Sequence, residues 1–171
     1  MTDPTPSTNH NNTDNAATAY FAAGCFWGVE LAFSSTPGVL DTEVGYMGGT
    51  TEHPTYEQVC RGDTGHAETV KVVYDPNRTT YEDLLRVFFA NHKPTQLNRQ
   101  GPDVGTQYRS ALFPVSDTQK AEAEAAIAAE DASGKWDKPV VTTIEPPATF
   151  YAAEEEHQDY LRKRGKSSCG I

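Results

Sequence analysis

The fold is decided by the stretch Thr18-Ala19-Tyr20-Phe21-Ala22-Ala23-Gly24-Cys25-Phe26-Trp27-Gly28. Residues 18–23 are apolar and aromatic, which predicts a short buried strand. From Val29 onward the apolar residues recur at the spacing of a packed helix. Cys25 therefore lies among the first residues of a helix, where unpaired backbone N–H groups and the helix dipole favour an anion. The junction predicts a cysteine that ionises more readily than a free one.

Two interpretations of Cys25 follow from this junction alone. The first is a small buried residue that only fills space, which is the common case for a lone cysteine. The second is a nucleophile, with Phe26 and Trp27 forming a wall that receives a small apolar or sulfur-containing group. The remaining cysteines, Cys60 and Cys169, have no metal-ligand spacing, so a zinc site or a disulfide scaffold fits poorly. A small number of widely separated cysteines favours reactive thiols, together with one cysteine that has no part in the chemistry.

Length and composition limit the kind of protein. The 171 residues predict one domain with a sizeable core. No apolar run approaches the roughly 20 residues that span a membrane, and a net charge of −10 argues against nucleic acid as a partner. Residues 1–17 are polar and lack the pattern of a signal peptide, which predicts a disordered N-terminal tail on a cytoplasmic protein. Residues 18–171 are expected to form a single catalytic domain with a mobile C-terminal tail, and we expect a monomer.

Strand and helix patterns alternate along the rest of the chain. Strands are expected over 39–46, 67–74, 108–113 and 140–144, and a loop over 98–106. Helices are expected over 55–60, after a Thr80 cap, from an Asp117 cap to about Gly134, and over 152–164. This order predicts an α+β fold, a two-layer sandwich with a mixed central sheet and a ferredoxin-like core. Helices flank the sheet, and a coil-rich C-terminal tail follows.

Polar side chains beside glycine-rich turns are the candidates for chemistry, because function concentrates in such loops. They are Tyr56, His66 and Glu68 at the entrance to the third strand, and Asp103 and Tyr108 at the entrance to the fourth. His66 could be a base or a metal ligand. No second histidine lies at ligand spacing, which favours a structural hydrogen bond for His66.

Other polar residues have simpler explanations. Cys60, on the short helix, is interpreted as a small buried hydrophobic residue without a catalytic role. Tyr46 stands near glycines that explain a tight turn, so it is interpreted as structural. The run Glu154-Glu155-Glu156-His157 lacks the order of a zinc-protease motif and is interpreted as a solvated helical face.

Five sequence strings occur in the order and spacing of one known family, and they cover about residues 18–171. Together they make the chain resemble peptide methionine sulfoxide reductase A, with the first and last strings carrying most of the specificity. The strings are Gly24-Cys25-Phe26-Trp27-Gly28, Gly45-Tyr46-Met47-Gly48-Gly49, Pro54-Thr55-Tyr56, Gly65-His66-Ala67-Glu68 and Asp103-Val104-Gly105-Thr106-Gln107-Tyr108-Arg109-Ser110.

The resemblance implies a role for each matching residue. Cys25 matches the nucleophile, and Glu68 matches the acid that protonates the substrate oxygen. The two tyrosines that hold this oxygen are matched by Tyr56 and Tyr108, and a supporting acid is matched by Asp103. Phe26 and Trp27 match the pocket for the substrate's S-methyl group, and Cys169 matches the first resolving cysteine of the tail. A second tail cysteine has no match, which implies a cycle of two cysteines.

The resemblance also implies the reaction and its partners. The substrate is the S epimer of methionine sulfoxide, in proteins or free, and the function is repair of oxidised proteins. Attack leaves Cys25 as a sulfenic acid, which Cys169 resolves as a disulfide. Thioredoxin or another external dithiol reopens the disulfide, and no cofactor or metal is required. An ionised Glu68 would repel the thiolate and could not give a proton, so Glu68 is expected to stay neutral in poorly hydrated surroundings.

Two other functions are compatible with a reactive cysteine. A cysteine hydrolase or acyltransferase would use Cys25 with His66 and need no reductant. It would have no use for Cys169 or for a neutral acid beside the thiol. A protein that only binds oxidised methionine segments would hold its substrate unchanged, and the tail cysteine argues against this as well.

Overall fold

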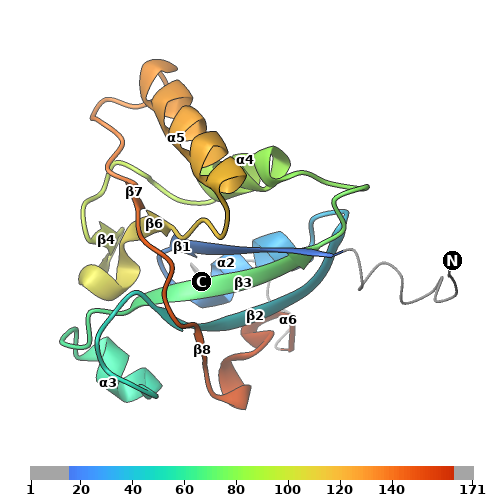
Figure 1. The fold of residues 1–171 in the computed structure, drawn as a ribbon. Helices are drawn as coiled ribbons and strands as arrows, with labels where there is room; N and C mark the ends of the chain where they lie inside the picture. The colour runs from blue at the N-terminus through green and yellow to red at the C-terminus, as the bar shows by residue number, and fades with distance from the viewer. Residues whose placement is uncertain (1–15, 164–171) are drawn as a thin grey trace, which may run out of the picture.

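The computed structural model describes residues 16–163. Its centre is a six-stranded sheet with the order β7-β6-β1-β3-β2-β8 (Figure 1). Neighbouring strands are antiparallel except for β6 and β7, which are parallel, so the sheet is mixed as expected. The strands are β1 (Ala17–Ala23), β2 (Val39–Met47), β3 (Ala67–Tyr74), β6 (Ser110–Leu112), β7 (Thr143–Ile144) and β8 (Tyr151–Ala152).

The central part of the sheet has ferredoxin-like connectivity, which confirms the expected α+β fold. The chain runs through β1, α2 (Phe26–Ser34), β2, β3, α4 (Tyr81–Ala90) and β6, while the strands lie in the order β6-β1-β3-β2. Helix α2 packs on β2 and β3, α4 packs on β1, and the two helices touch each other. The longer helix α5 (Asp117–Ala132) lies against α4 at the top of Figure 1.

The main core lies between the sheet and helices α2 and α4. Phe21 of β1 is fully buried and stacks on Phe33 of α2 with ring centroids 4.6 Å apart. Its ring also lies 5.8 Å from Phe88 of α4. Burying an aromatic side chain of this size contributes about 2 to 3 kcal/mol, so these contacts hold α2 firmly on the sheet. The strand that precedes Cys25 and the helix that follows it are therefore packed firmly against each other, which fixes the position of the junction between them.

Helix starts follow the capping signals with one exception. Thr80 caps α4, and Thr55 caps the short helix α3 (Tyr56–Cys60), each within a capping box. For α5 the expected Asp117 cap is wrong, because Ser116 has the extended backbone and its side chain accepts the N–H of Gln119. Asp117 instead occupies the first turn, where its carboxylate interacts favourably with the helix dipole.

Three further elements differ from expectation. The expected loop contains a two-stranded hairpin of β4 (Arg99–Gln100) and β5 (Asp103–Val104), followed by the 3₁₀ helix η1 (Thr106–Tyr108). Tyr108 therefore precedes strand β6 rather than opening it. Only residues 143–144 of the strand expected over 140–144 join the sheet, because Val141 N–H donates to the Pro94 carbonyl instead.

The long helix expected over 152–164 is wrong. The segment forms β8, the 3₁₀ helix η2 (Glu155–His157) and the short helix α6 (Tyr160–Lys163). Asp159 has a φ of +53°, a left-handed conformation that breaks a helix. The side chain of Gln158 hydrogen-bonds to both the N–H and the carbonyl of Val44, so the segment is tied to the edge of β2.

Candidate active site

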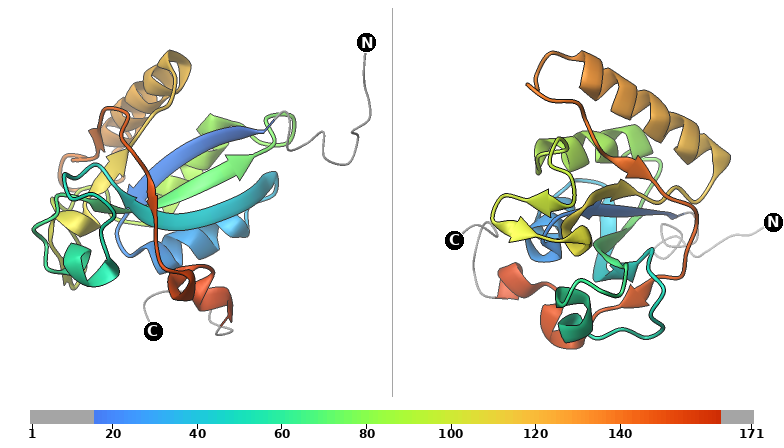
Figure 2. Two further views of the ribbon diagram at one scale, coloured as in Figure 1. Left: turned by 60° about the horizontal axis from the view of Figure 1, so that its bottom comes forward. Right: turned by 90° about the vertical axis from the view of Figure 1, so that its left-hand side faces the viewer.

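The site lies where the end of β1 meets α2. Figure 2 shows the β4–β5 hairpin, α3 and the η2–α6 segment around this end of the sheet. Gly24 has a φ of +92°, and a Cβ there would lie 2.6 Å from Cγ of Gln100, so only glycine fits beneath the hairpin. Cys25 is the N-cap of α2 and is partly exposed. The expected position of Cys25 at a helix N-terminus is therefore confirmed.

Glu68 reaches the same helix start from strand β3. Its side chain is 2% exposed, and its Oε1 accepts a hydrogen bond of 3.0 Å from the backbone N–H of Phe26. Phe26 is the residue next to Cys25 in the chain. The bond therefore brings the acid of strand β3 beside the cysteine at the start of α2.

Aromatic rings surround the helix start. The ring of Phe26 is fully buried and lies 5.8 Å from Tyr46 and 6.2 Å from Tyr56. The indole of Trp27 lies 6.1 Å from Tyr56 and stacks on Tyr160, with centroids 3.9 Å apart. These rings make the surroundings of Cys25 and Glu68 largely apolar.

The side chains of Tyr56 and Tyr108 both lie close to Glu68. Burial is the main cause that raises the pKa of Tyr56, and the neighbouring Cys60 thiol and Glu68 carboxyl raise it further. Burial and the neighbouring Glu68 carboxyl also raise the pKa of Tyr108, with smaller contributions from Cys60, Asp103 and Cys25. Both phenols therefore keep their protons at neutral pH and can act as hydrogen-bond donors.

The structure thus brings together most of the site residues expected from the sequence. Cys25, Glu68, Tyr56, Tyr108 and Asp103 converge on one region, and Phe26 and Trp27 flank it. Cys169 lies outside the described residues. The roles of all these residues in a reaction stay predictions at this point.

Cys60 differs from expectation. It is exposed rather than buried, and its thiol lies near Tyr56 and Tyr108. Partial desolvation of the sulfur is the main cause that raises the pKa of this thiol. The i, i+4 spacing of Tyr56 and Cys60 on one helical turn could have indicated this contact from the sequence.

His66 has the structural hydrogen-bonding role that was expected. Its ring is 2% exposed, and Nδ1 accepts the backbone N–H of Gly49 at 2.9 Å. Nε2 therefore carries the proton and donates to the Thr51 carbonyl at 2.7 Å. With both nitrogens bound to the backbone, His66 is not available as a base for Cys25.

The run 154–157 is only partly the solvated face that was expected. Residues 154–156 are exposed, but Glu154 accepts hydrogen bonds from the Tyr46 hydroxyl at 2.9 Å and the Tyr56 N–H at 3.0 Å. His157 is 6% exposed, and its Nδ1 accepts the indole N–H of Trp27 at 3.2 Å. These residues position the aromatic part of the site. No local pattern indicates them, because their partners lie about a hundred residues earlier in the chain.

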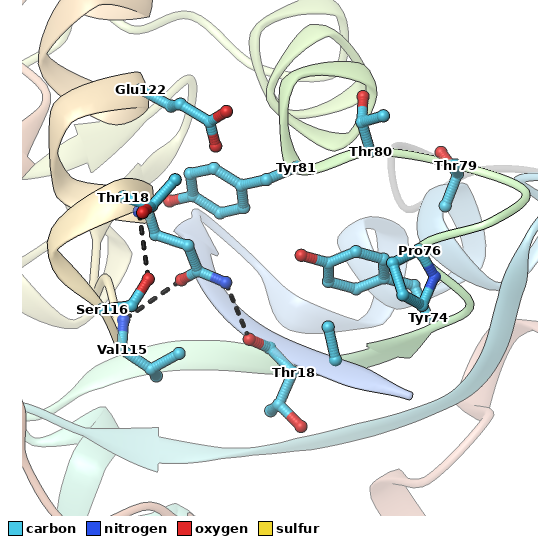
Figure 3. Close-up of a pocket in the computed structure, with 12 residues that line it drawn as sticks. Thr18, Tyr74, Pro76, Thr79, Thr80, Tyr81, Val115, Ser116, Thr118 and Glu122 are labelled. Atoms are coloured by element: carbon cyan, nitrogen blue, oxygen red, sulfur yellow. Dashed lines mark hydrogen bonds between the residues drawn. The ribbon is translucent and has the colours of Figure 1, made fainter. Parts of the chain in front are cut away.

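A separate cavity lies between the starts of α4 and α5 and the start of β1 (Figure 3). It has a volume of about 440 Å³, and Tyr74 and Tyr81 line it. Gln119 also lines it, with its amide donating to the Thr18 carbonyl and its oxygen accepting the Val115 N–H. None of the expected site residues lines this cavity, so it is not the active site.

Within residues 16–163, no cluster of three His, Cys, Asp or Glu side chains could hold a metal ion. No helix in this range is long and apolar enough to cross a membrane.

A cysteine at a helix start, a buried acid bonded to the next residue and two protonated phenols define a thiol-dependent enzyme. Comparison with known proteins identifies the family. The family model described as peptide methionine sulfoxide reductase matches residues 17–171. The chain belongs to the peptide methionine sulfoxide reductase family, and it is an oxidoreductase that reduces methionine sulfoxide.

Two relatives illustrate the sequence similarity. The chain is 57% identical over 151 residues to the peptide methionine sulfoxide reductase MsrA of Methanoculleus marisnigri, covering 88% of this chain and 92% of that protein. It is 58% identical over 151 residues to MsrA of Geobacter sulfurreducens, covering 88% and 93%.

Solved structures agree with the fold. Methionine sulfoxide reductase A of Corynebacterium diphtheriae matches with a TM-score of 0.79 and 38% identity, covering 91% of this chain and 78% of that one. Reduced Mxr1 of Saccharomyces cerevisiae matches with a TM-score of 0.80 and 38% identity, covering 89% and 87%. Mxr1 has also been solved in complex with Trx2, and that structure matches with a TM-score of 0.60 and 28% identity, covering 86% of each chain.

Proposed function

We propose that this enzyme reduces methionine-S-sulfoxide, protein-bound and free, through a sulfenic acid on Cys25. The Cys25 thiolate attacks the sulfoxide sulfur and forms an S–S bond, while the oxygen takes up two protons and leaves as water. Water then attacks the Cys25 sulfur and gives up a proton, the S–S bond breaks, methionine leaves, and Cys25 becomes the sulfenic acid. The thiol loses two electrons and the sulfoxide gains them, so this half of the cycle needs no other reductant. The preference for the S epimer rests on the family resemblance of the motifs.

The observation that carries this proposal is the hydrogen bond from Phe26 N–H to Glu68. It keeps a carboxyl group next to the nucleophile, and this carboxyl is 2% exposed. Burial disfavours the charged form of an acid, so a neutral Glu68 is able to give its proton to the sulfoxide oxygen. Without a proton the oxygen is a poor leaving group, and a charged Glu68 would repel the thiolate.

The remaining residues are assigned by their chemistry and position. Tyr56 and Tyr108 donate hydrogen bonds to the sulfoxide oxygen, since both hydroxyls stay protonated near Glu68. Asp103 supports Tyr108 from the hairpin that precedes it. Phe26 and Trp27 receive the S-methyl group, for which an apolar wall suits better than water.

The second half of the cycle needs a resolving thiol. Cys169 attacks the Cys25 sulfenic acid, a disulfide forms, and water leaves. Thioredoxin then reduces the disulfide by thiol–disulfide exchange. The complex of the similar yeast protein Mxr1 with Trx2 supports this choice of reductant. Because the cycle depends on reduced thiols, we place it in the cytoplasm, with oxidised proteins as substrates and a single chain as the working unit.

The proposal is tested by following both epimers of methionine sulfoxide, resolved by chromatography, with excess dithiothreitol. Loss of the S epimer alone, abolished by Cys25→Ser, is the expected result. Equal consumption of both epimers, or continued turnover by folded Cys25→Ser, would contradict it. A hydrolase is not supported, because its base would be His66, whose two nitrogens are bound to the backbone.

A further inference from the structure

The side chain of Gln100 lies against the turn that leads into Cys25. Gln100 is the last residue of strand β4, and a Cβ placed on Gly24 would lie 2.6 Å from its Cγ and 2.9 Å from its Cβ. The side chain therefore packs directly on the backbone of the residue before Cys25. The β4–β5 hairpin thus meets the start of α2 through this side chain.

The amide end of Gln100 is paired with a main-chain peptide group. Its Oε1 accepts the backbone N–H of Lys93 at 2.9 Å, and its Nε2 donates to the Lys93 carbonyl at 2.7 Å. An amide can donate and accept at the same time, which this pairing requires. Two bonds to one residue also fix the orientation of the amide more closely than a single bond would.

Lys93 is a firm anchor for this amide, because both of its neighbours in the chain are held. Nε2 of His92 forms a hydrogen bond of 2.7 Å with the hydroxyl of Ser110, a residue of strand β6. The carbonyl of Pro94 accepts the Val141 N–H at 2.8 Å. The hairpin is therefore tied to a segment that is itself bonded to the main sheet.

Asp103 lies on the same face of the hairpin as Gln100. The two residues are directly opposite each other in the antiparallel pair, and the side chains of opposite residues share a face. The other pair, Arg99 and Val104, belongs to the outer face, where both residues are exposed. Since Gln100 packs on Gly24, the face that carries Asp103 is the one turned toward the start of α2.

We propose that Gln100 is a positioning residue that holds the β4–β5 hairpin on the Cys25 junction and so keeps Asp103 in place for the reaction. The inference rests on the proposed function, in which Asp103 supports Tyr108 at the sulfoxide oxygen. The amide of Gln100 is engaged by Lys93, so Gln100 affects the rate through Asp103. The aromatic wall for the S-methyl group comes from other elements, so the effect falls on the chemical step and not on substrate binding.

The test variant is Gln100→Met. Methionine has the length of glutamine and keeps the contact with Gly24, but it cannot pair with the Lys93 peptide group. The hairpin should still form, because the Gly101 N–H at its turn remains bonded to Oε1 of Gln96 at 2.7 Å. Amide hydrogen exchange at Lys93 should be slow in the wild type and faster in the variant. Equal exchange in the two proteins would overturn the proposal.

The rate of methionine formation in one turnover, without reductant, measures the effect on the reaction. Loss of these modest hydrogen bonds corresponds to roughly a three- to tenfold lower rate at saturating methionine sulfoxide, with the half-saturating concentration unchanged. The matched control is Val104→Ala, which changes a 65% exposed side chain on the outer face of the hairpin and should match the wild type. A wild-type rate in Gln100→Met, or an equal loss in Val104→Ala, would overturn the proposal.

A double-mutant cycle identifies the residue through which Gln100 acts. In an Asp103→Asn background, Gln100→Met should have little further effect, because the carboxylate that Gln100 positions is gone. An undiminished effect there would overturn the proposal. If Asp103→Asn alone is as fast as the wild type while Cys25→Ser is inactive, the supporting role of Asp103 is wrong, and positioning by Gln100 fails with it. If folded Cys25→Ser still forms methionine, the proposed function itself is wrong.

Discussion

Phe26 and Glu68 are joined across the sheet by a hydrogen bond of 3.0 Å from the backbone N–H to Oε1. The bond connects the first residue of α2 to strand β3, and it fixes the acid beside Cys25. Glu68→Gln keeps an oxygen that can accept this N–H but cannot give up a proton. We expect an intact fold and a fall of about 10² to 10⁴ in the single-turnover rate of sulfoxide reduction. Rapid-quench kinetics measures this, and a rate within tenfold of wild type would exclude Glu68 as the acid.

His157 holds the indole ring of Trp27 in place. The indole N–H donates to Nδ1 of His157, and the two rings also stack with centroids 5.8 Å apart. His157→Phe keeps a ring but leaves the indole N–H without this acceptor, which costs about 1 to 3 kcal/mol of stability. A loosened Trp27 should also raise KM for methionine sulfoxide.

The control for this prediction is Trp27→Phe, which has no N–H to satisfy. In that background, His157→Phe should cost much less stability, as measured by urea unfolding. Equal losses in both backgrounds would show that the hydrogen bond is not responsible.

Arg109 holds the segment that carries Tyr108. Its guanidinium forms two bonds to Glu145, of 2.7 and 2.9 Å, and donates to the carbonyls of Gly65 and Thr106. Arg109→Lys keeps the charge but loses the planar fork that makes these bonds together. We expect a loss of about 1 to 2 kcal/mol in the free energy of unfolding, together with a lower kcat. A lysine variant with wild-type stability and kcat would show that the charge alone is sufficient.

The same contacts show how far the sequence predicts this site. Strand β3 and helix α4 were predictable, because alternating and helical patterns and the Thr80 cap are local signals. The pairing of Trp27 with His157 was not predictable, because it depends on how the chain returns after β8. The same is true of the broken helix at Asp159, where Gln158 finds the backbone of Val44. Cys60 was misjudged because the sequence of so short a helix does not show which side faces solvent, and in α3 it is Val59 that is buried.

Glu30 predicts a pH dependence of stability. Its side chain is 1% exposed, and burial is the main cause that raises its pKa from 4.5 to about 7. The charge of Asp159 raises it further, whereas hydrogen bonds from Asp159 N–H and Thr42 and the charge of Arg162 lower it. The folded protein therefore holds a proton that the unfolded chain releases between about pH 4.5 and 7. The contribution of Glu30 to the free energy of unfolding is therefore fully present below pH 4.5 and is lost as the pH rises to about 7.

Glu30→Gln removes this titration while keeping an acceptor for Asp159 N–H. Relative to the wild type, the variant should gain stability between pH 5 and pH 8, by on the order of 3 kcal/mol at most. Urea unfolding of both proteins at the two pH values gives the difference, and other titrating groups cancel in it. A difference that does not change with pH would mean that Glu30 ionises normally in the folded protein.

In the proposed cycle the sulfoxide oxidises Cys25 to the sulfenic acid, and Cys169 is needed only afterwards. Cys169→Ser isolates the first half of the cycle. Mixed with excess methionine-S-sulfoxide and thioredoxin, this variant should release one equivalent of methionine per enzyme and then stall. Mass spectrometry with a sulfenic acid trap should place one added oxygen on Cys25. Continuous turnover at the wild-type rate, or an adduct on Cys60 instead of Cys25, would contradict the account.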